Sequence, residues 1–157
     1  MGDGPEREPL QALVRSRNLD DIVQFRGWLP PEGVAEVLDS AHLLVQPSYS
    51  EGLPWTCLEA MARGVPVVAA RVGGLSELLE PSEGADSPGA ASVGFCVPPN
   101  RSDKLLMALA QALEGPDALA RLALMGARAR ERVALHFSAQ QELNELCSLY
   151  RRLARRA

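Results

Sequence analysis

The spacing of apolar positions along the chain predicts short strands that alternate with helices. Apolar residues three or four positions apart indicate amphipathic helices, and short apolar runs bounded by glycine or proline indicate strands. Helices are predicted over residues 5–18, 30–38, 54–63, 75–79, 103–113, 117–135 and from 138 onwards. Strands are predicted over residues 22–25, 43–45, 65–70 and 94–97.

The predicted strands lack a clean alternation of apolar and polar residues, which is typical of strands buried on both faces. Because strands and helices also alternate along the chain, the pattern predicts an α/β fold. Its parallel sheet would have about four strands flanked by helices, followed by C-terminal helices over residues 101–157. Residues 81–93, which contain the run PSEGADSPGAAS, are predicted to form a mobile surface loop within one domain spanning residues 1–157.

Composition and charge indicate what kind of core the protein has and which classes of partner it lacks. Hydrophobic residues make up 46% and aromatic residues 4% of the 157 positions, so the core is expected to be leucine, valine and alanine. The net charge of −4 gives no overall attraction to nucleic acid. Three cysteines, an odd number spread widely, fit reduced thiols. No signal-peptide pattern and no run near the ~20 apolar residues of a membrane span are present, so a cytoplasmic protein is expected.

The segment with the strongest chemical signal is QPSYSEGLPWTCLEAMARG, residues 46–64. It leaves a predicted buried strand and enters a predicted helix, and ligands of open α/β sheets bind beyond the carboxyl ends of the strands. Helix N-termini suit phosphate groups because their N–H groups are unpaired. Gly52 would let the backbone approach such a ligand closely.

Two acids in this segment, Glu51 and Glu59, are eight positions apart. On a helix this spacing leaves an offset of about 80°, so both could border one pocket. Carboxylates accept hydrogen bonds from neighbouring sugar hydroxyls, which favours a polyol site beside an anion site. Spacing alone leaves a second interpretation equally open: Glu51 interacts with the helix dipole and Glu59 is a solvated helix residue.

The acids of segment 46–64 belong to a series of short motifs that follow one another along most of the chain. The motifs are Pro47-Ser48, Glu51-Gly52, Glu59, Ala60–Val68 and Gly73–Glu77, with GDGPERE at 2–8, VQFRGWLP at 23–30 and GFCVPPN at 94–100. This set resembles the retaining glycosyltransferases of family 4 (glycosyltransferase group 1). The resemblance covers nearly the whole chain and implies a B-type fold, in which two Rossmann-like domains face each other across a cleft. The chain would be part of the C-terminal domain, which binds the nucleotide-sugar donor.

The resemblance also implies roles for single residues. Glu51 would contact the transferred sugar close to the reacting centre and is the catalytic candidate. Glu59 would bind the ribose hydroxyls. Backbone N–H groups around Gly52 and Leu53 would lie near the sugar and diphosphate. The donor-binding residues predicted in this way are Ser48, Gly52, Leu53, Pro54, Glu59 and, beside the nucleobase, Trp28.

The chain departs from the family pattern in two places. Pro54 has no N–H where many members have glycine, so one possible donor is missing. The family also clamps the diphosphate with an Arg in a Gly-Arg-Leu-like turn and a following Lys. The only lysine here is Lys104, and no arginine occupies such a turn. We therefore expect the chain to begin after two strands and the N-terminal acceptor domain, and not to transfer sugar alone.

The expected ligand is a UDP-, GDP- or ADP-sugar donor, with no cofactor and no metal. The partner would be the missing acceptor domain. The arginine-rich C-terminal end is expected to be a solvated helix end that suits the helix dipole, and peripheral membrane contact is an alternative only in the full enzyme. A non-catalytic sugar-nucleotide-binding module completed by a separate chain is the alternative. An unrelated nucleotide-binding Rossmann protein is disfavoured because the sequence has neither a Gly-x-Gly-x-x-Gly turn between a strand and a helix nor a phosphate-loop lysine motif.

Four other residues invite functional interpretations. Cys57 is expected to be a small core residue rather than a nucleophile. His42 is expected to be structural, and His136 to interact with a helix dipole. Glu77 matches a family acid, and the sequence leaves open whether it contacts the donor or holds its loop.

Overall fold

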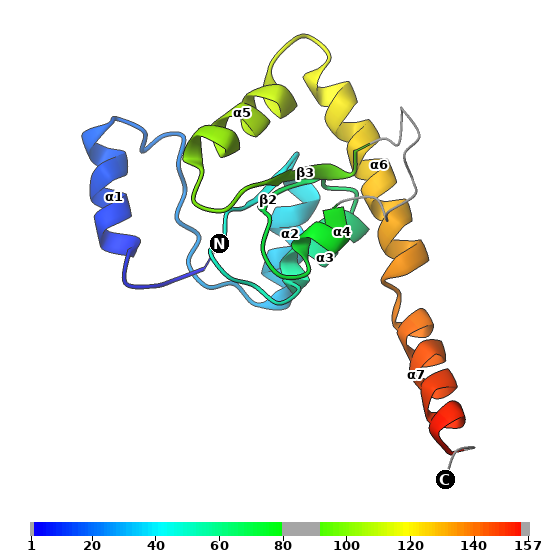
Figure 1. Ribbon diagram of the computed structural model, residues 1–157. Coiled ribbons are helices and arrows are strands. Elements are labelled where there is room, and N and C mark those ends of the chain that lie inside the picture. Colours follow the sequence, from blue (N-terminus) through cyan, green and yellow to red (C-terminus); the bar gives the residue numbers. More distant parts are fainter. Residues whose placement is uncertain (1, 80–91, 155–157) are drawn as a thin grey trace. The chain divides into compact units, whose positions relative to one another are not determined.

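The computed structural model describes residues 2–79 and 92–154 of the chain (Figure 1). Most of the predicted loop over 81–93 therefore lies outside the described residues. The chain divides into two compact units, Met1–Val37 and Leu38–Ala157. The helices are α1 Arg7–Ser16, α2 Pro31–Ser40, α3 Trp55–Ala62, α4 Leu75–Leu79, α5 Ser102–Leu113, α6 Ala118–His136 and α7 Ala139–Ala154. The strands are β1 Leu44–Gln46, β2 Val67–Ala70 and β3 Gly94–Val97.

The first unit contains α1 but not the strand predicted over residues 22–25, so that prediction was wrong. The backbone N–H groups of Ile22 and Val23 donate to the carbonyl of Leu19 at 3.0 and 2.9 Å, which closes a turn. The Ile22 side chain is 77% exposed. A short apolar run becomes a strand only where a neighbouring strand pairs with it. No such neighbour exists among the described residues of this unit. In the part of the chain that the structure describes, the sheet has three strands rather than about four.

The second unit is built on a parallel sheet with the strand order β1-β2-β3. Gln46 at the end of β1 is level with Ala69 of β2, which is level with Cys96 of β3. The carboxyl ends of all three strands therefore meet at one edge of the sheet. This is the edge at which α/β proteins bind ligands.

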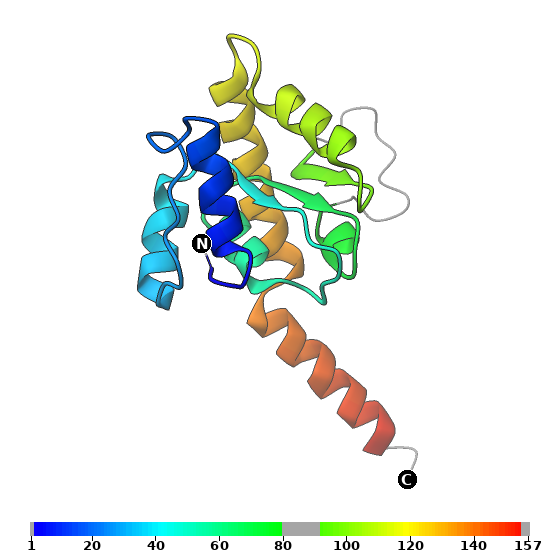
Figure 2. The same ribbon diagram turned by 90° about the vertical axis from the view of Figure 1, so that its left-hand side faces the viewer.

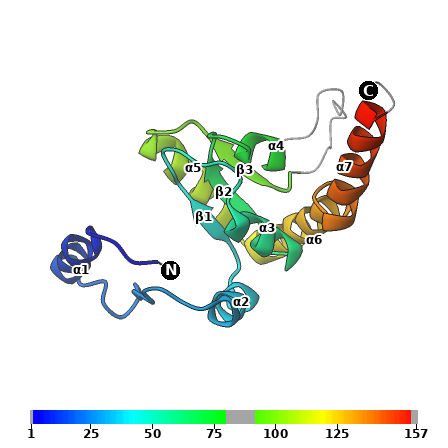
Figure 3. The same cartoon turned by 90° about the horizontal axis from the view of Figure 1, so that it is seen from below.

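Helices cover both faces of this sheet, as the sequence predicted. In Figure 3, α5 lies on one side of the strands, and α3 and α4 lie on the other. All four residues of β2 are buried. Val68 packs with Val97 and with Ala108 of α5 in one apolar cluster. Because side chains alternate along a strand, Val67 and Ala69 face the opposite side.

Helix α3 begins and ends within one residue of its predicted bounds, and α7 begins one residue after its predicted start. Pro54 precedes α3 in an extended conformation, and Gly64, at φ +79°, follows its C-terminus. At α7, the Gln141 N–H donates to the Ser138 hydroxyl at 3.3 Å, as in a capping box. The Gln141 side chain instead donates to Glu145, so only half of the box forms.

Helix α7 follows α6 and extends away from the sheet of its unit (Figure 2). None of its residues is buried. Its last turn carries Arg151 and Arg152, both exposed. Among the described residues, no helix is long and apolar enough to cross a membrane.

Candidate functional site

Two loops at the carboxyl edge of the sheet are held against each other. The first follows β1 and contains Glu51 and Gly52, and the second follows β2 and contains Gly73 and Gly74. The Gly74 N–H donates to the carbonyl of Gly52 at 2.7 Å. A Cβ on Gly73, which has φ +51°, would overlap the carbonyl oxygen of Glu51 and lie 2.6 Å from that of Gly52. Because these two glycines have no Cβ, the backbone of the second loop can contact the backbone of the first directly.

The side chains of Gln46, Ser48 and Glu51 form a hydrogen-bonded triangle within the first loop. The Ser48 hydroxyl donates to Oε1 of Glu51 at 2.8 Å, and Nε2 of Gln46 donates to the same oxygen at 3.0 Å. Nε2 of Gln46 also donates to Oγ of Ser48 at 2.9 Å. All three side chains are partly buried. This arrangement fixes the predicted catalytic carboxylate at the mouth of α3.

The other predicted donor-binding residues are distributed around the start of α3. Leu53 packs beside Gly74, and Pro54 is the residue at which α3 begins. Glu59 is exposed on α3, and its carboxylate makes no hydrogen bond or ion pair with any residue that the structure describes, whereas its backbone carbonyl accepts from the Arg63 N–H. Trp28 belongs to the first unit, where its side chain is 74% exposed. The roles of these residues toward a donor stay predictions.

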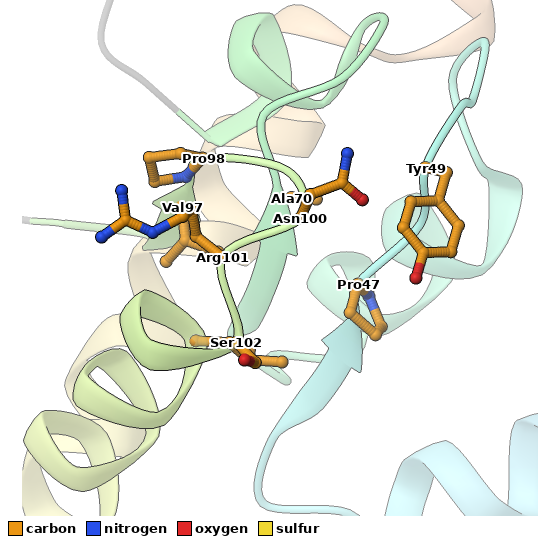
Figure 4. Close-up of a pocket in the computed structure, with 9 residues that line it drawn as sticks. Pro47, Tyr49, Ala70, Val97, Pro98, Asn100, Arg101 and Ser102 are labelled. Carbon is orange, nitrogen blue, oxygen red and sulfur yellow. The ribbon is translucent and has the colours of Figure 1, made fainter.

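A cavity of about 260 Å³ opens where the three strands end (Figure 4). Pro47 after β1, Ala70 of β2 and Val97 of β3 contribute to its wall. Tyr49, a residue that is 80% exposed, lines it from the same loop as Pro47. Pro47 and Tyr49 face this cavity, whereas Ser48 between them bonds to Glu51. The loop after β1 thus contributes residues both to this cavity and to the neighbouring hydrogen-bonded triangle around Glu51.

The far wall of this cavity is polar and comes from the start of α5. Asn100, at φ +58°, Arg101 and Ser102 line it. The Arg101 guanidinium donates to both carboxylate oxygens of Asp103, at 2.7 and 2.6 Å. This hydrogen bonding by Arg101 holds the pKa of the Asp103 carboxyl at about 2. In this structure the Arg101 guanidinium at the edge of the cavity is therefore paired with Asp103.

Sequence reasoning assigned no individual role to several polar or aromatic residues of this edge, among them Gln46, Tyr49, Arg101 and Ser102. A polar residue at the end of a buried strand is the signal that could have identified Gln46. The polar run after the last predicted strand could have identified Arg101 and Ser102, since it falls at the same sheet edge as the segment 46–64. That Arg101 and Ser102 lie near the loop after β1 can be known only once the strand order of the sheet is known.

A second cavity, of about 440 Å³, lies between the start of α3 and the junction of α6 with α7. Leu53, Trp55 and the exposed Glu77 line it. Glu77 therefore stands near the predicted donor loop, and its two predicted roles remain open. His136 is the last residue of α6, as expected of a histidine that interacts with a helix dipole. In the described part of the chain, no three His, Cys, Asp or Glu residues gather to hold a metal ion.

Cys57, on α3, is a core residue, as predicted, with 0% exposure. Burial, and secondarily the charge of Glu51, raise the pKa of its thiol from 9.0 to about 12. At pH 8 only about one molecule in ten thousand then carries the reactive thiolate. We expect a thiol reagent to modify the exposed Cys147 within minutes and Cys57 at least about a thousand times more slowly.

The reaction of Cys57 can be followed alone in a Cys96→Ser/Cys147→Ser variant, with the same protein in urea as the control. Rapid labelling of the folded variant would contradict the burial of the Cys57 thiol.

The raised pKa of Cys57 also makes stability depend on pH, because the unfolded chain loses this proton at a lower pH than the folded chain does. The contribution of Cys57 to stability is complete below about pH 9 and is lost as the pH rises toward about 12.

Comparison with known proteins connects this geometry to one family. Residues 1–132 match the family described as "Glycosyl transferases group 1". WcaL of Escherichia coli (strain K12), a proposed colanic acid biosynthesis glycosyltransferase, is 35% identical over 161 residues. That alignment covers 98% of this chain but 36% of WcaL.

Solved structures give the same result. Sucrose-phosphate synthase from Thermosynechococcus elongatus superimposes with a TM-score of 0.77 at 33% identity, covering 98% of this chain and 36% of that one. Anabaena HepE, solved in complex with UDP-glucose, superimposes with a TM-score of 0.67 at 25% identity, covering 94% of this chain and 39% of HepE. The chain therefore spans just over a third of the length of these relatives.

Proposed function

Because the chain belongs to the glycosyl transferases group 1 family, we propose that it forms the nucleotide-sugar-binding part of a glycosyltransferase. The parent enzyme would transfer a sugar from a nucleotide diphosphate sugar to an acceptor with retention of configuration, as in family 4. The observation that carries this proposal is the fixed Glu51 carboxylate at the mouth of α3, at the carboxyl edge of a parallel sheet. HepE, a similar protein, was solved with UDP-glucose, which supports a donor of this chemical class.

Within this proposal, Glu51 accepts a hydroxyl of the transferred sugar and Glu59 accepts the ribose hydroxyls. The exposed Glu59 carboxylate offers two oxygens to a pair of neighbouring hydroxyls. The backbone at Gly52 faces open space, since a Cβ there would have no atom within 4 Å. That space is available to the sugar or the diphosphate. Trp28 is the proposed nucleobase neighbour.

The acceptor site is proposed to come from parts of the enzyme that correspond to the remaining length of the relatives. The chain alone is therefore proposed to bind donor without sustained sugar transfer. A non-catalytic assembly module is not favoured, because the family and the similar proteins are glycosyltransferases or sugar-transferring enzymes by name.

Titration of the 157-residue chain with UDP-, GDP- and ADP-glucose tests the proposal. Glu59→Ala is expected to weaken the preferred nucleotide sugar by about tenfold or more, since hydrogen bonds to a charged group are lost. It should weaken the corresponding nucleoside diphosphate equally, because both ligands carry the ribose. The matched control is Glu131→Ala, which removes an exposed carboxylate from α6. Equal affinities of Glu59→Ala and the native chain would exclude the ribose role.

A further inference from the structure

The two hydrogen bonds to Glu51 end on the same carboxylate oxygen. Oε1 accepts from the Ser48 hydroxyl and from Nε2 of Gln46. Nε2 of Gln46 also donates to the Ser48 oxygen at 2.9 Å, and the Ser48 hydroxyl in turn donates to Glu51. Among the described residues, Oε2 of Glu51 has no hydrogen-bond partner.

The triangle is anchored to the sheet rather than to the loop alone. Gln46 is the last residue of β1, and its backbone is held in register with Ala69 of β2. The backbone of Glu51 is held separately, because Gly73 packs against its carbonyl group. A long, flexible carboxylate side chain is thus restrained at both ends. Restraint before binding reduces the entropy that a ligand must otherwise remove.

We propose that Gln46 and Ser48 are positioning residues that hold Glu51 by Oε1 and leave Oε2 to accept a hydroxyl of the transferred sugar. This inference rests on the proposed function, in which Glu51 contacts that sugar. It gives Ser48 a role through Glu51 in place of the direct donor contact that the sequence suggested. It assigns to Gln46 a function that no motif in the sequence indicated.

The test compares a sugar nucleotide with its nucleoside diphosphate, because only the first contains the sugar. The pairs are UDP-glucose with UDP, GDP-glucose with GDP, and ADP-glucose with ADP, and the pair that the native chain binds best is used. Gln46→Glu places an acceptor where the donor to Glu51 stood, at 3.0 Å. It is expected to weaken the sugar nucleotide about tenfold and to change affinity for the diphosphate less than about twofold. Ser48→Ala should weaken the sugar nucleotide about fivefold.

Two controls separate positioning from a general structural effect. Gln140→Glu makes the same chemical change on the exposed surface of α7 and should leave both affinities unchanged. In a Glu51→Gln background, Gln46→Glu should cause no further weakening, because Gln46 acts only through the carboxylate. Additive weakening would overturn the inference, since it would show that Gln46 contacts the ligand or shapes the site independently. Thermal unfolding of each variant checks that it folds, and Ser48→Ala tests the triangle should Gln46→Glu not fold.

The remaining outcomes distinguish this inference from the proposed function. If Glu51→Gln weakens the sugar nucleotide while Gln46→Glu and Ser48→Ala behave like Gln140→Glu, the positioning role is overturned and the sugar contact of Glu51 stands. If Glu51→Gln changes neither affinity, both are overturned. If the native chain binds none of the three sugar nucleotides, the proposed function fails and the inference fails with it.

Discussion

Replacing Gly126 with alanine is expected to lower the free energy of unfolding of the second unit by about 3 kcal/mol or more, and its melting temperature by roughly 10 °C. Gly126 lies within α6, where it crosses the C-terminal end of α3. A Cβ at this position would overlap the carbonyl oxygen of Gly64 and lie 2.8 Å from its carbonyl carbon. Both are backbone atoms, so the overlap can be relieved only if the two helices move apart.

Intrinsic helix propensity predicts the opposite sign, since alanine is favoured over glycine by about 1 kcal/mol within a helix. Thermal unfolding followed by circular dichroism therefore decides between propensity and packing. Gly33→Ala is the matched control, because its Cβ in α2 would meet its nearest atoms at an ordinary 3.5 Å. That change should stabilise α2 by about 0.5–1 kcal/mol. A Gly126→Ala protein as stable as the native chain would refute the close approach of α3 and α6.

The second large effect is expected at the functional edge, from Gly73→Ala. Alanine is disfavoured at φ +51° by about 1–2 kcal/mol, and its Cβ would overlap the Glu51 carbonyl oxygen. We expect a total loss of stability of about 2–4 kcal/mol. Displacement of Glu51 should also weaken binding of the preferred sugar nucleotide by at least about tenfold.

Amide hydrogen exchange gives a measurement of this effect that needs no ligand. The Gly74 N–H, which donates to Gly52 at 2.7 Å, should exchange faster in the Gly73→Ala protein. Gly52→Ala is the control from the opposing loop, since nothing lies within 4 Å of its added Cβ. Its melting temperature should stay within about one degree of the native value. Unchanged exchange at Gly74 in the Gly73→Ala protein would show that the two loops are not in backbone contact.

Most elements could be predicted because their signals are local. The residues of α4 and β3 were predicted to the residue, and α3 begins one position after Pro54, the predicted start. Turn residues such as Gly64 restrict the backbone wherever they stand, so their effect is readable from sequence. Residues 22–25 were predicted wrongly because strand formation depends on a partner, and apolar content gives no information on whether one is present.

The candidate site was only partly predictable for a related reason. The position of segment 46–64 between a strand and a helix was predicted correctly, because a buried strand followed by a helix start is a local pattern. The hydrogen bonds of Gln46 to Ser48 and Glu51 were not predicted, although all three residues lie within this segment. Side-chain directions in an irregular loop depend on what packs against it, and here that neighbour is the Gly73 loop.

The sequence alone determined the alternation of strands and helices, the parallel sheet and the family to which the chain belongs, because these follow from periodicity and from ordered local motifs. Tertiary structure alone decided that the sheet has three strands within residues 2–79 and 92–154, and that Gly73 and Gly126 lie at backbone contacts. It also decided that the Glu51 carboxylate is held through one oxygen by Gln46 and Ser48. The physical reason is that a close approach between segments far apart in the chain leaves no local sequence pattern. The residues next to a glycine or a glutamine in the sequence do not show whether a distant segment packs against it.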